Sequence, residues 1–316
     1  MLMLDEQQLR AHVTLNDESL RRIEDAFAAL ASGQAVVPPP MALDVPECQG
    51  EVHIKGARLV GAPNMAVKIV SGFYDNPKIG LPMSNGLVIV MSAETGVLQA
   101  VLLDNGYLTE VRTGLAGALA AKYAAPERIT TVGMIGVGSQ ARYQLRALRL
   151  VRDFRRVMVW GRRIDAAAAY AREMTVELGI EIVVCDAAER VVRESQVVIT
   201  TTPARRPIVS AEWIHPGLHV TAVGSDGPDK QELDASILAR ADHVVCDLVS
   251  QCARLGELHH ALEGHLIPNE RVTELGQHVL AGRSVRSNDD EVTIVDLTGV
   301  GVQDAAIAAY ALERAV

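Results

Sequence analysis

Aromatic residues and cysteines are scarce in this sequence. Its 316 residues include 3 Phe, 2 Trp and 6 Tyr, so a hydrophobic core has to be built mostly from Ala, Val, Leu and Ile. The few cysteines form no Cys-x-x-Cys pair, which excludes a disulfide-rich scaffold and the common zinc-ribbon spacing. We therefore predict free thiols that are buried as small hydrophobic residues, at Cys48, Cys185, Cys246 and Cys252.

An excess of positive charge and long apolar runs are absent as well. The chain has 30 Lys and Arg against 39 Asp and Glu, and no basic block marks a nucleic-acid-binding face. No apolar run is long enough to span a bilayer, and the first residues lack the basic start and apolar core of a secretory signal. These features predict a cytoplasmic enzyme with no nucleic-acid partner and no membrane partner.

Hydrophobic residues are plentiful, and their pattern changes along the chain. The sequence is 49% hydrophobic and 22% charged, as in ordinary globular proteins, and its length suggests two domains. We expect a first helix that is capped by Asn16 or Asp17 and ends near Gly33. Strands are expected over 51–60, 65–73, 86–91 and 97–103, followed by a helix rich in Ala and Gly over 109–125.

From Ile129 onward the chain alternates strands and helices. Strands are expected over 129–135, 157–160, 181–185, 196–200, 218–223, 243–247 and 292–297, with helices such as 140–151 and 165–178 between them. This alternation predicts a parallel sheet with both faces covered. We therefore predict an α/β protein with a Rossmann-type domain over 126–298. A final Ala-rich helix that starts at Gln303 is expected to return to the first domain, which then comprises 1–125 plus 299–316.

A glycine-rich turn follows the strand that ends at Ile135. The run Gly136-Val137-Gly138-Ser139-Gln140-Ala141 fits the G-x-G-x-x-G/A pattern between a strand and a helix, as dinucleotide-binding sites require. Gly136 allows the tight turn, Gly138 lets backbone N–H groups approach the pyrophosphate, and Ala141 permits close helix–strand packing. The alternative is a purely structural turn, but more strand-like segments follow at suitable spacing. We therefore predict that this turn binds NAD(P)H, with the phosphates on the helix N-terminus.

The end of the second strand of this domain carries no acid. NAD sites usually place Asp or Glu there to hold the ribose 2′-OH. This sequence reads Trp160-Gly161-Arg162-Arg163, and its first acid is Asp165. The guanidinium groups of Arg162 and Arg163 can clamp a 2′-phosphate, or both can be solvated residues at a helix start. The pattern favours NADPH over NADH and does not exclude NADH.

Five segments together resemble the ornithine cyclodeaminase/mu-crystallin family. They occur in the family's order and spacing and lie over nearly the whole chain, at 65–70, 108–113, 133–142, 223–233 and 299–304. The resemblance implies a Rossmann domain joined to a discontinuous α+β substrate-binding and dimerisation domain that is built from both chain ends. It also implies a homodimer, and chemistry at the α-carbon and α-nitrogen of a small-molecule amino or imino acid.

The resemblance leaves three functions open. The first is an NAD(P)H-dependent imino-acid reductase or amino-acid dehydrogenase, an oxidoreductase acting on CH–NH₂ or C=N groups. The second is a cyclodeaminase, an ammonia-releasing lyase with a recycled NAD that acts on a diamino acid. The third is a mu-crystallin-like NADPH-dependent binding protein. Segments 38–44, 72–77 and 103–108 most resemble a branch associated with ectoine utilisation and similar to iminosuccinate reductase. We therefore predict the first function, with iminosuccinate reduced to aspartate.

Three residues match the family's reactive positions. Lys68 and Arg112 match positions that bind the substrate α-carboxylate, and Asp226 matches the catalytic carboxylate, which exchanges a proton with the substrate nitrogen. Lys68 is predicted to be catalytic as well. A lysine inside an apolar strand is costly to bury without an anion, and arginine offers a bidentate fork to a carboxylate. The alternatives are surface charges for Lys68 and Arg112 and a turn residue for Asp226.

Other residues match family positions near the cofactor. Lys230 and Glu232 also match family positions and are expected to lie behind the residues that contact the substrate. The predicted cofactor-binding set is Ser84, Arg112, Thr113, Gly136, Gly138, Ser139, Gln140, Arg162, Thr201, Val223, Gly224, Ser225, Lys230 and Thr298.

One position departs from the cyclodeaminases. They place an Arg that binds the substrate carboxylate where this chain has Met41, whereas this chain has Lys55 where relatives more often carry an apolar residue. We hypothesise that Lys55 supplies the missing cation from a different direction, which suits a dicarboxylic imino acid better than ornithine. An ordinary surface lysine is the alternative.

A histidine cluster invites comparison with a metal site. His260 and His265 do not share a helix face, and no strand supplies obvious partners for them or for His259. We predict no metal site.

Overall fold

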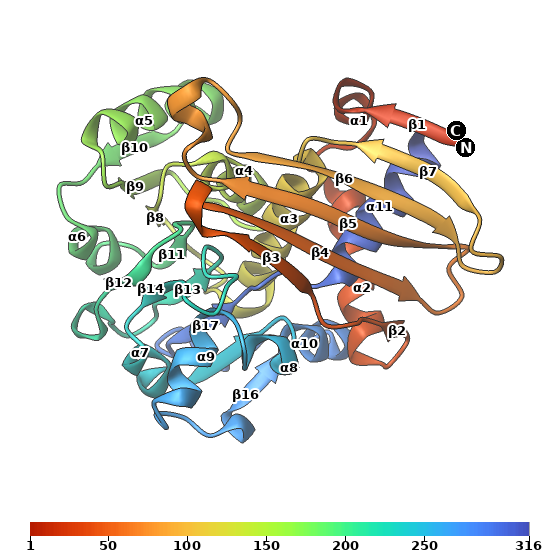
Figure 1. Cartoon of the computed structure of the whole chain (residues 1–316). Helices are drawn as coiled ribbons and strands as arrows, with labels where there is room; N and C mark the ends of the chain where they lie inside the picture. The colour runs from red at the N-terminus through yellow and green to blue at the C-terminus, as the bar shows by residue number, and fades with distance from the viewer. Residues whose placement is uncertain (316) are drawn as a thin grey trace. The chain divides into compact units, whose positions relative to one another are not determined.

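The computed structural model describes residues 1–315, which divide into two compact units (Figure 1). Unit 1 comprises Met1–Arg112 and Val300–Val316, and unit 2 comprises Thr113–Gly299. The first division falls inside helix α3 (Tyr107–Ala124). The domain boundary that we place after residue 125 therefore stays a prediction. No helix in the described part of the chain is both long enough and apolar enough to cross a membrane.

Unit 1 is built on one twisted sheet with the strand order β1-β7-β6-β5-β4-β2, in which β3 also pairs with β4. The four central strands form an antiparallel meander, and β1 runs parallel to β7. The strands are β1 (Leu2–Asp5), β2 (Ala35–Val36), β3 (Met41–Val45), β4 (Gly50–Leu59), β5 (Asn64–Phe73), β6 (Ser84–Ser92) and β7 (Leu98–Leu103).

Three helices belong to unit 1 as well: α1 (Glu6–His12), α2 (Asp17–Ala31) and α11 (Gly301–Ala315). Helix α11 packs on β4 and β5 and against α2, so the last residues of the chain complete the unit that the first residues begin (Figure 1). Asn16 caps α2 as predicted, because its side chain accepts from the backbone N–H of Ser19. The predicted return of the C-terminal helix to the first part of the chain is thus observed.

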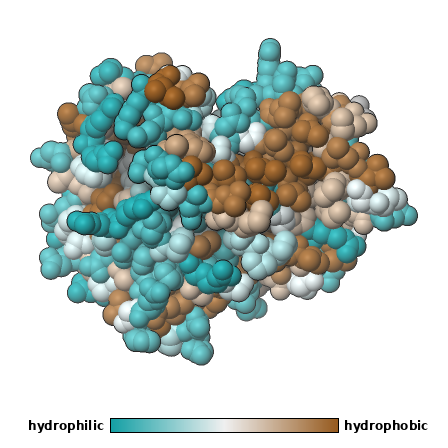
Figure 2. All heavy atoms as spheres, viewed as in Figure 1, coloured by the Kyte–Doolittle hydropathy of each residue, from teal (hydrophilic) through white to brown (hydrophobic). Residues whose placement is uncertain are grey.

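The two faces of this sheet differ in exposure. Residues of the inner face, such as Val88, Val90 and Leu102, are at most 1% exposed, and α11 packs on this sheet against β4, β5 and β6. The outer face carries cross-strand rows of apolar residues that are half-buried or exposed, and Figure 2 shows hydrophobic atoms gathered there. We define the outer sheet face by these two rows: Met41, Ile54, Ile69 and Leu87; and Val67, Ile89, Val101 and Met3.

Unit 2 is a doubly wound sheet of eight parallel strands with the order β10-β9-β8-β11-β13-β17-β15-β16. The order reverses at β8, so the predicted Rossmann-type fold is confirmed. The strands are β8 (Thr131–Ile135), β9 (Arg156–Trp160), β10 (Glu181–Val184), β11 (Val197–Thr200), β13 (His219–Ala222), β15 (His243–Cys246), β16 (Val272–Glu274) and β17 (Thr293–Asp296).

Helices on both faces complete unit 2 (Figure 1). They are α4 (Ser139–Leu148), α5 (Ile164–Leu178), α6 (Ala188–Arg193), α7 (Ser236–Arg240), α8 (Val249–Cys252), α9 (Gly256–Glu263) and α10 (Leu275–Ala281).

Some elements escape the sequence pattern. In unit 2, β12 (Arg205–Val209) and β14 (Gln231–Leu233) form a separate parallel pair, and both are too short or too polar to predict. The exposed strand β3 follows three prolines and was not expected either. All four cysteines are free thiols, as predicted, but Cys48 is exposed, so the prediction of a buried residue is wrong for it. It ends a 3-10 turn at the surface that begins with Pro46.

Candidate active site

The glycine-rich turn of unit 2 has the geometry of a phosphate cradle. Gly136 has a φ of +111°, and a Cβ there would lie 2.5 Å from Thr201 Oγ1. Gly138 is the N-cap of α4, and a Cβ there would meet no atom within 4 Å. Ala141 is fully buried. Within residues 1–315 no side chain makes a cap hydrogen bond to this helix, so its N-terminus is suited to bind a pyrophosphate.

Strand ends bring further predicted residues to the same edge of the unit 2 sheet. Thr201, Val223 and Thr298 directly follow or nearly follow the carboxyl ends of β11, β13 and β17. The carboxyl ends of parallel strands lie at one edge, which is where open α/β sheets bind ligands. Thr298 is 2% exposed, and its hydroxyl accepts a hydrogen bond from Gln251 Nε2 at 2.8 Å. The first turn of α4 also contains Ser139 and Gln140.

The two arginines after β9 differ in their contacts. Both are exposed, and Arg163 Nη2 lies 3.3 Å from Asp165 Oδ2. Within the described part of the chain, Arg162 makes no ion pair. Of the two arginines proposed for a 2′-phosphate, Arg162 is therefore the one with a guanidinium available.

A cluster of buried charges lies in unit 1. Lys68 on β5 and Arg112 on α3 both contact the same oxygen of Asp304 on α11, with Lys68 Nζ and Arg112 Nε each 3.0 Å from Oδ1. Arg112 Nη1 also donates to Gln303 Oε1 at 2.9 Å. Lys68 is 2% exposed, Arg112 5% and Asp304 1%. None of the three is a surface charge.

Asp304 is a residue whose role the sequence pattern missed. Its position belongs to the last segment that resembles the family, but nothing in that segment names its partners. The available signal was the polar pair Gln303-Asp304 at the start of an otherwise apolar helix. Although burial acts to raise it, the pKa of Asp304 is held below its ordinary value by Lys68 and Arg112. Asp304 is therefore a fixed anion that orients two cations.

Lys55 joins this group as a third cation. It pairs with Lys68 directly across β4 and β5, so the two side chains share one face of the sheet. Lys55 is 5% exposed, which removes the alternative of an ordinary surface lysine. We call Lys55, Lys68 and Arg112 the cation cluster. Burial, followed by the charge of Arg112, lowers the pKa of Lys68 to about 7.

Two buried carboxylates interact with the cation cluster. Asp304 contacts two of its members, and the buried Asp104 interacts electrostatically with Lys68 while it accepts from the N–H of Leu108 at 2.8 Å. Burial raises the pKa of Asp104 above its ordinary value. The cation cluster thus brings three basic side chains together beside Asp304, an arrangement suited to binding an anion.

Met41 does not lie where the exchange with Lys55 would require. It pairs with Ile54, so its side chain lies on the outer sheet face, opposite to that of Lys55, and it is 53% exposed. The hypothesis about Lys55 therefore rests on the burial of Lys55 beside Lys68 and not on a replacement of position 41.

Asp226 lies in the loop that follows β13 in unit 2. Its side chain is 38% exposed and its Oδ1 lies 2.7 Å from Lys230 Nζ, whose own side chain is 5% exposed. Ser225 Oγ donates to the carbonyl of Lys230 at 2.7 Å. A partly exposed carboxylate at the carboxyl edge of the sheet, held by one lysine, is suited to exchange a proton with a ligand.

The remaining predicted cofactor residues lie at a strand start, in a helix and in the loop after β13. Ser84 begins β6 in unit 1, and its Oγ lies beside Gly106, where an added Cβ would be 3.0 Å away. Thr113 offers its carbonyl to Gln144 Nε2 at 3.0 Å. Gly224 follows Val223, and its N–H donates to Glu232 Oε2 at 2.8 Å.

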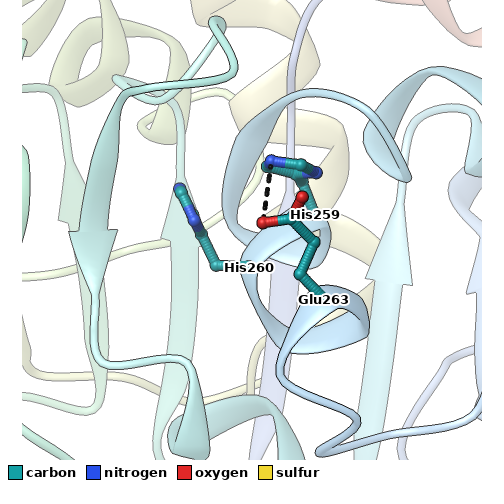
Figure 3. Close-up of side chains that lie close together, drawn as sticks. All are labelled: His259, His260 and Glu263. Atoms are coloured by element: carbon teal, nitrogen blue, oxygen red, sulfur yellow. Dashed lines mark ion pairs between the residues drawn. The ribbon is translucent and has the colours of Figure 1, made fainter.

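The histidines of α9 form a compact group with Glu263. Ligand atoms of His259, His260 and Glu263 all lie within 4.8 Å of one another. His259 Nε2 is 3.5 Å from Glu263 Oε2, whose side chain is 70% exposed. His260 Nε2 lies 2.8 Å from the carbonyl of Lys230, and Figure 3 shows its ring pointing away from the His259–Glu263 pair. The prediction that no metal binds here stays a prediction.

The chain is similar to known proteins over its whole length. A model of the ornithine cyclodeaminase/mu-crystallin family matches residues 1–316. A Sinorhizobium fredii protein named an uncharacterized cyclodeaminase is 47% identical, over 100% of this chain and 96% of its own length.

Solved structures are similar to this chain over the same length. The Thermococcus litoralis Δ¹-pyrroline-2-carboxylate reductase in complex with NADH and L-proline has a TM-score of 0.94 at 31% identity, over 100% of this chain and 97% of that chain. An archaeal alanine dehydrogenase dimer with bound NAD has a TM-score of 0.91 at 36% identity, over 100% of this chain and 96% of that chain. The iminosuccinate reductase of Paracoccus denitrificans in complex with NAD⁺ has a TM-score of 0.90 at 31% identity, also over 100% of this chain and 96% of that chain.

Proposed function

Because this chain belongs to the ornithine cyclodeaminase/mu-crystallin family, we propose that it is an NAD(P)H-dependent imino-acid reductase whose substrate is iminosuccinate. Enzymes similar to it over their whole length are nicotinamide-dependent reductases and dehydrogenases of imino and amino acids, and the chain is an enzyme of this class. The product would be aspartate.

The observation that carries the proposal is the cation cluster. An imino dicarboxylate brings two negative charges, and a water-poor site stabilises them only if cations are already in place. Lys68 and Arg112, which Asp304 orients, are suited to the α-carboxylate. Lys55 adds a cation for the second carboxylate on the same sheet face. An ornithine side chain, which ends in a cation, would be repelled there.

The residues of each unit have separate tasks in this mechanism. In unit 2, Gly136, Gly138 and the N-terminus of α4 would hold the dinucleotide, which would supply the hydride for the imine carbon. Asp226, or a water that it orients, delivers the proton to the substrate nitrogen, and Lys230 holds Asp226 Oδ1. In unit 1, the cation cluster binds and orients the carboxylates.

The test is a turnover assay with two imines that differ in one carboxylate. Iminosuccinate forms from oxaloacetate and ammonia, and iminopropionate from pyruvate and ammonia. Lys55→Met should lower kcat/KM for iminosuccinate by about 30–1,000-fold, since one charged contact in a shielded site is worth on the order of 2–4 kcal/mol. Turnover of iminopropionate should change much less.

The matched control is Lys78→Met, because the Lys78 side chain is 73% exposed. It should leave both activities unchanged. Equal losses for both imines in Lys55→Met would show that Lys55 does not select the side chain. Conversion of ornithine to proline with release of ammonia and no net change in NAD(P)H would replace the reductase by a cyclodeaminase.

For the cofactor, we propose that Arg162 favours NADPH. The support is its exposed guanidinium after β9, where no acid is present to hold a ribose 2′-OH. The similar structures described above hold NADH or NAD, so both cofactors have to be compared. Arg162→Ala should raise KM for NADPH far more than KM for NADH, because only NADPH carries the extra phosphate. Equal changes would mean that Arg162 does not contact the 2′ position.

We also propose that the chain forms a homodimer through the outer sheet face. This face is a continuous apolar surface on an antiparallel sheet, and monomeric proteins rarely leave such a surface in water (Figure 2). A second copy of the chain is the occupant that fits best, because a dimer is the form of the similar archaeal alanine dehydrogenase.

A further inference from the structure

The loop that carries Asp226 begins at Gly224 and ends at Lys230, and both of its ends are anchored by side chains outside it. Gly224 follows β13, and Lys230 leads into β14. The sequence predicts proton exchange at Asp226 but does not show what fixes the shape of the loop. Its contacts show what holds it in one shape.

Glu232 anchors the start of the loop. Its carboxylate is fully buried and accepts four hydrogen bonds: from Thr200 Oγ1 at 2.7 Å, from the N–H and hydroxyl of Thr202 at 2.6 and 2.8 Å, and from the N–H of Gly224 at 2.8 Å. The packing is close, since a Cβ on Gly224 would lie 2.2 Å from the carbonyl oxygen of Thr202. One side chain thus ties the end of β11 to the first residue of the loop.

His260 anchors the end of the loop. Its Nε2 lies 2.8 Å from the carbonyl oxygen of Lys230, which is an acceptor, so Nε2 carries the proton and donates. Ser225 Oγ donates to the same carbonyl at 2.7 Å. The position of the Lys230 backbone sets where its ammonium group meets Asp226 Oδ1, at 2.7 Å.

Helix α9 is the common support of both anchors. Glu257, one turn before His260, accepts from the N–H groups of Glu232 at 2.7 Å and of Leu233 at 3.1 Å. Asp296 at the end of β17 accepts from the N–H of Leu258 at 2.9 Å, which fixes the first turn of α9 to the central sheet. The short strand β14 is therefore held to α9 at 232 and 233, and the residue before it, Lys230, is held there as well.

We propose that Glu232 and His260 are positioning residues for Asp226, in that they fix the two ends of the loop and so the direction of the proton-transferring carboxylate. This inference rests on the proposed role of Asp226. Neither residue touches the reacting atoms. Each acts on the distance between Asp226 and the substrate nitrogen, where an error of about 1 Å can cost about 10²-fold in rate.

The first arm of the test concerns His260. His260→Ala should lower kcat by about 10–100-fold, because it removes the donor to the Lys230 carbonyl and so releases the end of the loop that carries Asp226. His260→Gln should restore most of kcat, since its amide can donate to the Lys230 carbonyl. His259→Ala is the matched control, as its side chain pairs with Glu263, and it should leave kcat unchanged. Equal losses in the His259 and His260 variants would overturn the role of His260.

The second arm concerns Glu232 and uses a double-mutant cycle. Glu232→Gln should lower kcat in the intact enzyme but cause no further loss when Asp226 is already Asn, because a positioning residue has nothing left to position. A full additional loss in the Asp226→Asn background would show a role independent of Asp226 and overturn the proposal. If Glu232→Gln does not fold, Thr202→Val can take its place, because it removes one of the four donors to Glu232. Its effect on kcat is then compared with and without Asp226→Asn.

Different results would overturn the proposed chemistry of Asp226 and the positioning by Glu232 and His260. If Asp226→Asn keeps near-normal kcat, the proposed chemistry of Asp226 is wrong. If Asp226→Asn is inactive while Glu232→Gln and His260→Ala keep full kcat, the chemistry stands and the positioning proposal is overturned.

Discussion

At the scale of single residues, Lys68 shows what burial does to a charge. Its ammonium group is 2% exposed, and burial together with Arg112 lowers its pKa to about 7 although Asp304 opposes the change. The folded chain therefore binds fewer protons at Lys68 than the unfolded chain between pH 7 and the ordinary lysine pKa of 10.5. Over that window, this group alone makes the free energy of unfolding rise with pH.

Burial favours the neutral form of Lys68, and a bound anion should instead favour its charged form. A substrate carboxylate favours the charged ammonium, so binding above pH 7 requires uptake of a proton, and the affinity should fall as pH rises. We expect the Ki of succinate, whose carboxylates stay ionised in this range, to increase by up to about tenfold per pH unit above pH 7. Lys68→Arg, which stays charged, should bind with little dependence on pH. A flat pH profile in the unaltered enzyme would contradict a role for Lys68 in anion binding.

At the scale of elements, helix α11 can approach the sheet only because its first residue has no side chain. A Cβ on Gly301 would lie 2.3 Å from the carbonyl oxygen of Gly56 in β4, and that oxygen belongs to the backbone. Gln303 and Asp304 follow in the same turn, so the approach of this helix also sets their contacts with Arg112.

Gly301→Ala should therefore destabilise the protein and disturb anion binding together. Forcing a methyl group into a packed contact costs about 1–3 kcal/mol in the free energy of unfolding. Urea unfolding would measure that loss, and the Ki of succinate should rise in the same variant. Gly33→Ala is the comparison, because a Cβ there meets no atom within 4 Å and only the φ of +72° is strained. A Gly301 variant with the stability and Ki of the unaltered chain would show that the contact relaxes freely.

At the scale of the whole molecule, the proposed homodimer rests on the outer sheet face. Met41 and Leu43 on β3 are each 53% exposed, so charges there should not disturb the fold of a monomer. The double variant Met41→Lys plus Leu43→Lys should convert the dimer into a monomer, since an interface loses affinity when unpaired charges are desolvated. Light scattering after size exclusion would give the mass of the particle.

Val176→Lys provides the control for that experiment. Val176 is an apolar residue of unit 2 that is 87% exposed, and its substitution should leave the mass unchanged. A dimer that persists in the double β3 variant would place the interface on another surface.

The sequence by itself determined the elements whose signals are local. Period-two apolar patterns predicted β4 to β7, and the alternation after Ile129 predicted the parallel sheet, because strand and helix periodicities are properties of short segments. The cradle at Gly136 and Gly138 was predictable for the same reason, since turn, strand and helix adjoin in the chain. Lys68, Arg112 and Asp226 were predicted as site residues through a family resemblance of similarly short segments.

Only the tertiary structure decided which distant residues meet. Arg112 and Asp304 are separated by 192 residues, and α11 has to pack on β4 and β5 before they come within 3.0 Å. The same holds for His260 and the Lys230 carbonyl, and for Glu232 and the end of β11. Strand pairing also decided that Lys55 faces Lys68 while Met41 faces outward. Such contacts depend on register and packing, in which a shift of one residue reverses every side chain, and no local pattern records them.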